Sequence, residues 1–229
     1  MLTLFDPLYW LIVGPTMLLA LFATLRVKST FAKYQNVGVK SGMTGAEAAA
    51  AVARAGGAEG ITIERVQGFL SDHYDPRTRT LRLSPDVYDG RSISAIAVGA
   101  HEAGHAVQHA HAYAWLTFRS QMVPVASIGS NLWIWIFFAG IFLHAPYLVN
   151  IGIAIFALIV LLQIVTLPVE IDASNRAKAV LASTGIVSTP EEAQGVNKVL
   201  GAAAMTYVAG ALTAVATLIY YIMLANRRN

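Results

Sequence analysis

The sequence contains no cysteine, and only 13% of its 229 residues are Asp, Glu, Lys or Arg. Without cysteine, the chain has neither a disulfide framework nor a zinc site built from thiolates. Soluble domains usually contain about 25% charged residues, so the shortage of charge argues against an ordinary soluble protein. With 56% hydrophobic residues and a mean hydropathy of +0.56, the composition indicates a protein of the lipid bilayer.

Charged residues are absent altogether from three long stretches, residues 7–25, 120–169 and 199–226. The first is long enough, at 1.5 Å per helical residue, to cross a hydrocarbon layer of about 30 Å. The second is too long for one crossing, and a tight turn fits at residues 144–147, which include a proline. We therefore predict four transmembrane helices, at residues 7–25, about 122–143, 147–167 and 199–226, the last with its apolar centre at 207–224.

Basic residues lie almost entirely in the two polar stretches, 26–119 and 170–198, which hold all but two of the 16 Lys and Arg residues. By the positive-inside rule, both stretches are expected in the cytoplasm. Arg227 and Arg228 are exceptions to this rule, because four complete crossings would place them outside the cytoplasm. The net charge of +3 is scattered near the membrane spans, which favours contact with anionic lipids over nucleic acid. The first apolar run lacks the flanks of a cleaved signal peptide and is expected to be retained.

The predicted fold class is an α+β membrane protein, with about four transmembrane helices and a small cytosolic domain of one central helix and short strands. Thr44 and Glu47 form a capping-box pattern before a helix at about 45–55. Alternating residues at 61–66 and 80–84 predict strands, with a turn at 75–77. Ser92 or Ser94 is expected to cap a helix that runs to about Trp115. The domains are expected at 1–26 (first span), 27–120 (small domain with the helix that begins near Ser92), 121–168 (hairpin of two spans), 169–198 (cytosolic segment) and 199–229 (fourth span and tail).

The most informative motif is His101-Glu102-Ala103-Gly104-His105. On a helix, residues four apart lie about 5 to 6 Å from each other on one face, so both imidazoles can converge on one metal ion. The carboxylate of Glu102 then reaches a neighbouring water molecule rather than the ion. This spacing predicts half of a zinc hydrolase site.

A catalytic zinc site needs a third protein ligand. His109 lies about 12 Å along the helix axis from His101, so it can join the ligands only if the helix breaks. Glu170 is the better candidate, because a hairpin of two spans returns the chain to the membrane face that it left. Asp172 is the competing carboxylate, although on a helix it would point away if Glu170 faces the site.

Several separated motifs of this chain closely resemble the YugP-like bacterial membrane zinc metallopeptidases, which belong to the neutral zinc metallopeptidases. They occur in order across about residues 42–212. The motifs are Asp72-His73-Tyr74-Asp75-Pro76, Leu81-Arg82-Leu83-Ser84, Val87-Tyr88, His101 to Gln108, Leu167-Pro168-Val169-Glu170-Ile171-Asp172-Ala173-Ser174 and Thr206-Tyr207-Val208-Ala209.

The resemblance implies a gluzincin-type site that holds one Zn²⁺ ion through His101, His105 and Glu170, with Glu102 as the catalytic base. The related HtpX-like proteases have Ala-Asp at the third and fourth places after their ligand glutamate. This chain has Ala173-Ser174 there, so it lacks a supporting carboxylate at that point.

Other residues are candidates for supporting roles. Tyr207 or Arg176 could stabilise the oxyanion of a tetrahedral intermediate. The candidates for contact with the ligands or their surroundings are Asp72, His73, His109 and Asp172. The strand near residues 81–83 offers an edge for an extended substrate, or simply packs within its sheet.

The function that we expect is a zinc-dependent endopeptidase of the bacterial inner membrane, with its active site facing the cytoplasm. Its partners would be membrane lipids and protein or peptide substrates that are membrane-associated or misfolded, whereas its oligomeric state is left open. One alternative is an intramembrane, site-2-type metalloprotease, because residues 92–118 contain only Glu102 as a formal charge. A second alternative is a non-catalytic zinc-binding membrane scaffold. A metal transporter is disfavoured, because the four spans lack charged residues for an ion path.

Overall fold

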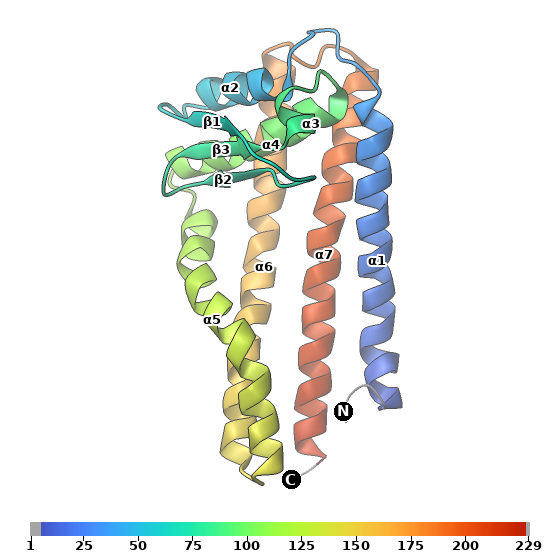
Figure 1. Ribbon diagram of the computed structural model, residues 1–229, viewed down its shortest axis with the longest axis vertical. Helices are drawn as coiled ribbons and strands as arrows, with labels where there is room; N and C mark the ends of the chain where they lie inside the picture. Colours follow the sequence, from blue (N-terminus) through green and yellow to red (C-terminus); the bar gives the residue numbers. More distant parts are fainter. Residues whose placement is uncertain (1–5, 228–229) are drawn as a thin grey trace. The chain divides into compact units, whose positions relative to one another are not determined.

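The computed structural model describes residues 6–227, so the outer ends of the first and last predicted domains, with Arg228, lie outside the described residues. The protein is mostly helical and has one small sheet (Figure 1). Its elements are α1 (Pro7–Gln35), α2 (Gly45–Ala55), β1 (Thr62–Arg65), β2 (His73–Asp75), β3 (Thr80–Leu83), α3 (Pro85–Tyr88), α4 (Ile93–Ala110), α5 (Ala114–Phe142), α6 (Pro146–Ser183) and α7 (Pro190–Asn226).

The chain divides into two compact units. The apolar unit comprises residues up to Thr24, Thr117–Leu167 and the chain from Thr206 onward. The polar unit comprises Leu25–Leu116 and Pro168–Met205. The four long helices α1, α5, α6 and α7 each contribute residues to both units, α5 only with its first three residues.

Among the described residues, four helices are long and apolar enough to cross a membrane: α1, α5, α6 and α7. They contain the four charge-free segments from which spans were predicted. Large hydrophobic side chains on them point outward, including Leu11 (73% exposed), Ile128 (65%) and Trp135 (73%). Such exposure is costly in water and favourable in lipid. The outer surface of these helices therefore supports association with a membrane.

Aromatic residues form the core of the apolar unit. Phe137 on α5 is fully buried, and Tyr220 and Tyr221 on α7 pack in the same cluster. The rings of Phe137 and Tyr221 meet edge to face, with their centroids 4.8 Å apart, an arrangement that adds to the gain from burial. The hydroxyl of Tyr220 donates a hydrogen bond to Asp6 (3.1 Å).

A three-stranded sheet in the order β1-β3-β2 lies in the polar unit. Strand β3 is central, pairing in parallel with β1 and antiparallel with β2. Asp75 closes the turn after β2 by accepting hydrogen bonds from the backbone of Arg77 and from the side chains of Arg82 and Thr78. These bonds lower the pKa of Asp75 to about 2. The predicted strands and turn are thus present, with β2 as the third strand.

Helices α2 and α4 begin where their capping residues predict. Thr44 and Glu47 form the expected capping box at α2. The Ser92 hydroxyl caps α4 by accepting from the backbone of Ala95 (3.2 Å), whereas Ser94 donates to the carbonyl of Phe31. The predicted end near Trp115 was wrong: α4 stops at Ala110, and Trp115 belongs to α5. Ala112 adopts a left-handed conformation (φ 48°), which ends a helix as glycine often does.

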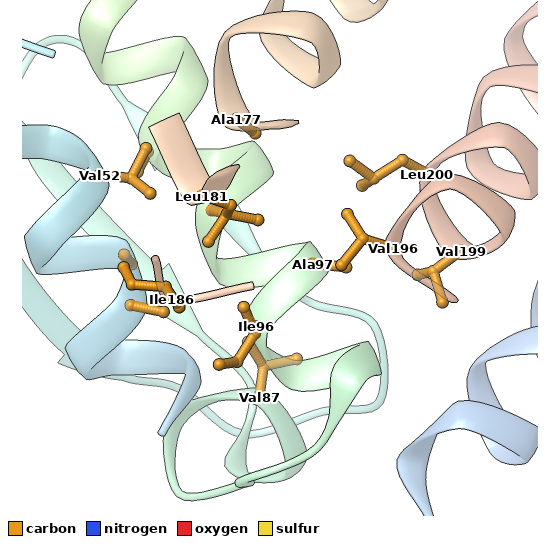
Figure 2. Close-up of a cluster of buried hydrophobic side chains, with 14 of the residues drawn as sticks. Val52, Val87, Ile96, Ala97, Ala177, Leu181, Ile186, Val196, Val199 and Leu200 are labelled. Atoms are coloured by element: carbon orange, nitrogen blue, oxygen red, sulfur yellow. The ribbon is translucent and has the colours of Figure 1, made fainter. Parts of the chain in front are cut away.

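The core of the polar unit gathers side chains from many elements, as Figure 2 shows. Val52 comes from α2, Ile96 and Ala97 from α4, Leu181 from α6 and Val196 from α7. All are at most 2% exposed. Burial of these side chains removes apolar surface from water, so α4 is held against both α2 and the polar-unit part of α6.

Candidate metal centre

Helix α4 presents His101 and His105 on one face, as their spacing predicts. The two imidazole rings meet edge to face with their centroids 4.8 Å apart. Both side chains are largely buried, with 12% and 9% of their surface exposed. Helix α4 is packed on α2, α3 and the sheet, so the direction of these two rings is set by the core of the polar unit.

Glu170 on α6 faces the two histidines, although it lies 69 positions after His101 in the sequence. Its Oε2 atom lies 3.2 Å from Nε2 of His101 and 3.5 Å from Nε2 of His105. The three donor atoms lie within 4.8 Å of one another. The Glu170 side chain is only 2% exposed. The structure therefore brings together the three side chains predicted as zinc ligands.

A glycine allows this close approach of α4 and α6. An added Cβ atom at Gly104 would lie 2.5 Å from the backbone oxygen of Ala173, nearer than non-bonded carbon and oxygen atoms come. Because Gly104 lies between the two histidines and Ala173 follows Glu170 by one helical turn, the absence of a side chain there sets the spacing across the site.

The outer nitrogen of each imidazole has its own partner. Nδ1 of His101 lies 3.0 Å from the hydroxyl of Ser174, and Nδ1 of His105 lies 3.0 Å from Oε1 of Gln108. Sequence reasoning missed both roles, since Ser174 was noted only as a replacement for a carboxylate. The spacing of Gln108, three residues after His105 on a helix, was the signal that could have identified it.

Asp172 reaches the site through Gln108. The amide nitrogen of Gln108 donates to Asp172 Oδ2 (2.8 Å) and to the backbone oxygen of Val169 (2.7 Å). Arg176 in turn forms an ion pair with Asp172. Asp172 thus contacts the surroundings of His105 and is not part of the three-residue donor group.

The donor set fits a zinc ion. Two imidazole nitrogens and one carboxylate oxygen are a familiar set for catalytic zinc, and metal-binding histidines typically hydrogen-bond through their other nitrogen. Burial alone would lower the pKa of His105, but hydrogen bonding and the negative charge of Glu170 raise it above its usual value. The site therefore favours positive charge between His105 and Glu170, from a proton or from a metal cation.

Glu102 lies beside His101 on α4 and is 9% exposed. None of the residues in 6–227 donates a hydrogen bond to its carboxylate. Asp72 is near enough for its pKa to respond: burial raises it, hydrogen bonds from Ser84 lower it, and the charge of Glu102 raises it again, so that it ends above its usual value. Asp72 accepts hydrogen bonds from the backbone and the hydroxyl of Ser84, and the role of Glu102 as catalytic base stays a prediction.

Two further candidates lie away from the donor group. The Nδ1 atom of His73 pairs with the backbone oxygen of Ser71 (2.8 Å), and Nδ1 of His109 pairs with the hydroxyl of Tyr74 (2.8 Å). A cavity of about 290 Å³ adjoins His109 and Tyr74, and Glu59 and Arg79 also line it. Neither His73 nor His109 contacts His101 or His105 through a hydrogen bond.

The two candidates for oxyanion stabilisation differ in their positions. Arg176 lies in the polar unit, where it contacts Asp172, Nδ1 of His111 (3.1 Å) and the ring face of Tyr113 (5.6 Å). Tyr207 belongs to the apolar unit. A catalytic role for either residue stays a prediction.

Four apolar helices and a buried group of two histidines and one glutamate define the class of this chain: a membrane-associated protein with a candidate zinc centre. A model of the family described as "Putative neutral zinc metallopeptidase" matches residues 9–226. The chain belongs to this family, which confirms the resemblance noted in its motifs. It is 45% identical over 206 residues to "Putative membrane protease YugP" of Bacillus subtilis (strain 168), covering 90% of this chain and 91% of that protein. No solved structure matches the chain.

Proposed function

We propose that this protein is an integral-membrane zinc endopeptidase, which hydrolyses membrane-associated or misfolded proteins near the cytoplasmic face. The observation that supports it most is the convergence of two histidine nitrogens on one carboxylate oxygen, at 3.2 and 3.5 Å. His101, His105 and Glu170 would hold the zinc ion. Zinc bound in such a set supplies a Lewis acid that polarises a carbonyl group and makes water more acidic.

The residues of the chain supply the proton transfers. The carboxylate of Glu102 accepts a proton from the attacking water and later returns it to the nitrogen of the departing amine. A carboxylate that accepts no hydrogen bond from residues 6–227 is suited to this shuttle. Ser174 and Gln108 hold the outer nitrogens of the histidines, so that both inner nitrogens stay directed toward Glu170.

Membrane-proximal substrates are favoured because each of the four long apolar helices also contributes residues to the polar unit. Arg26 follows the apolar part of α1, and Glu170 lies shortly after that of α6. The enrichment of Lys and Arg in the polar stretches supports a cytoplasmic position for this unit. The endopeptidase would then act on polypeptides at the headgroup level of the inner membrane.

The test combines zinc content with proteolysis of an unfolded, vesicle-anchored reporter polypeptide. We expect one zinc per chain in the wild type and in Glu102→Gln, but cleavage about 10²- to 10⁴-fold slower in the latter, the usual contribution of a general base. Glu170→Ala should lose both zinc and cleavage.

Glu191→Gln is the matched control, because it removes the same charge from an exposed position in the first turn of α7 and should leave both properties unchanged. Cleavage by Glu102→Gln at the wild-type rate would overturn the assignment of the base. Zinc binding without any cleavage by the wild type would support a non-catalytic scaffold instead.

A further inference from the structure

Gln108 is a fully buried polar residue (0% exposed) between α4 and α6. Its amide nitrogen donates to the backbone oxygen of Val169 (2.7 Å) and to Asp172 Oδ2 (2.8 Å). Its amide oxygen lies 3.0 Å from Nδ1 of His105. A buried amide with each side engaged has little freedom to rotate, because a lost hydrogen bond in the interior costs free energy.

The orientation of this amide follows from chemistry. A backbone carbonyl and an ionised carboxylate only accept hydrogen bonds. The NH₂ group of Gln108 must therefore face Val169 and Asp172, and its oxygen must face His105. Because that oxygen also only accepts, Nδ1 of His105 must carry the hydrogen. The neutral ring then has its lone pair on Nε2, the atom that faces Glu170.

Asp172 is itself fixed in place. Arg176 pairs with the same Oδ2 atom that accepts from Gln108. Arg176 is also in contact with Nδ1 of His111 and with the ring of Tyr113. Arg176 and Gln108 thus both donate to Asp172, and a charge-assisted hydrogen bond of this kind is strong. The donors therefore run from His105 through Gln108 to Asp172, where Arg176 donates from the other side.

His101 is held in a different way. Its Nδ1 atom meets the hydroxyl of Ser174, and a hydroxyl can donate or accept. Ser174 therefore supports the ring position of His101 without choosing which nitrogen carries the hydrogen. The tautomer of His105 is therefore fixed by its partner, whereas the tautomer of His101 is not.

We propose that Gln108 is a positioning residue that fixes the tautomer of His105 and presents Nε2 as the metal-binding atom, with Asp172 and Arg176 orienting Gln108. The effect of Gln108 on metal affinity rests on the proposed zinc site, whereas the tautomer of His105 depends only on its hydrogen bonds and exists without metal. Removal of a partner that orients a metal-binding histidine typically lowers metal affinity by roughly 10- to 100-fold.

The first experiment measures zinc affinity of the full chain in nanodiscs by competition with a chelator. Gln108→Leu should bind zinc roughly 10- to 100-fold more weakly than the wild type, and Ser174→Ala should lose less. The matched control is Ser94→Ala, which removes another buried hydrogen bond of α4, to the carbonyl of Phe31, and should keep wild-type affinity. Visible spectra of the Co²⁺-substituted proteins should change for Gln108→Leu and not for Ser94→Ala.

The second experiment uses no metal. In Glu170→Ala, whose side chain cannot hydrogen-bond Nε2 of His105, ¹⁵N spectra of labelled histidine at about pH 9 report the neutral imidazole. We expect hydrogen on Nδ1 of His105 in this variant, and on Nε2 once Gln108→Leu is added. The same nitrogen protonated in both variants would overturn the proposal.

These outcomes separate the inference from the proposed function. A wild-type protein without zinc affinity contradicts the zinc site, while the ¹⁵N experiment still tests the tautomer. Wild-type affinity in Gln108→Leu contradicts the positioning role alone. Should Gln108→Leu fail to fold, Asp172→Asn replaces it: its neutral amide is a weaker acceptor for Gln108, so zinc affinity should fall, and unchanged affinity would count against the proposal.

Discussion

Ser174 is the neutral partner of the outer nitrogen of His101. The hydroxyl lies 3.0 Å from Nδ1 of His101, on the helix that also carries Glu170. Related proteases were expected to place a carboxylate at this point, and a carboxylate would add negative charge beside the histidine. Because Ser174 is neutral, it adds no negative charge beside the donor set, in which Glu170 is the acidic group.

Asp72 leads to a pH-dependent prediction for a single residue. The folded protein raises the pKa of Asp72, so it binds this proton more tightly than the unfolded chain does. The contribution of Asp72 to stability is therefore greatest below about pH 4, the unfolded pKa, and is lost as pH rises through the higher folded pKa. Asp72→Asn lacks this loss, so its stability relative to the wild type should increase from pH 4 toward neutral pH, as measured by thermal unfolding.

The control is Asp72→Ala, which cannot accept the bonds from the backbone and hydroxyl of Ser84 (2.7 and 3.0 Å). It should be less stable than Asp72→Asn at every pH. A constant difference between Asp72→Asn and the wild type across this range would contradict the raised pKa.

At the scale of elements, the contact of α4 with α6 depends on Gly104. In Gly104→Ala the new Cβ would meet the backbone oxygen of Ala173 at 2.5 Å, and backbone atoms cannot move aside as a side chain can. We expect a loss of about 1 to 3 kcal/mol in unfolding free energy, together with weaker zinc binding, because the helices must separate at the site. Chemical denaturation and chelator competition measure the two effects.

Gly201→Ala is a matched control on α7, since nothing lies within 4 Å of its added Cβ. It should instead stabilise the protein by roughly 0.5 to 1 kcal/mol, because alanine favours a helix more than glycine does. Equal stability and zinc affinity of Gly104→Ala and the wild type would show that the helices tolerate a wider spacing.

The elements were more predictable than their mutual contacts. Local patterns were sufficient for the capping box of α2, the paired histidines on α4 and the four apolar segments, because each depends on residues a few positions apart. The partners of Ser174, Gln108 and His109 depend on how α4 is rotated against its neighbours, which no local spacing specifies. The end of α4 was missed because Ala112, a residue that rarely adopts positive φ, takes the left-handed conformation there.

At the scale of the whole molecule, the properties of α4 test the alternative of an intramembrane metalloprotease, in which this helix would lie within the membrane. Among the described residues α4 is not one of the four helices with the length and hydropathy of a membrane span, and Ala97 on it is completely buried in the polar-unit core. Chemical accessibility at Ala97 would therefore report protein packing and not membrane depth. Helix α4 is instead packed on α2 and the sheet within the polar unit.

Membrane topology can be tested directly because the chain has no native cysteine, so a single introduced cysteine is the only target for a thiol reagent. We expect a membrane-impermeant maleimide to label Tyr147→Cys in intact cells and to label Ser183→Cys only after the inner membrane is opened. Both positions are exposed in the structure. The unsubstituted protein serves as the blank, and labelling of Ser183→Cys in intact cells would reverse the proposed orientation.

The distance in sequence between His101 and Glu170, 69 positions, has a consequence for biosynthesis. When the ribosome has released α4, the nascent chain carries two imidazoles without their acidic partner, and α5 and most of α6 must still be made. If the three side chains hold zinc as proposed, the site can be completed only after the chain has been made as far as Glu170 on α6.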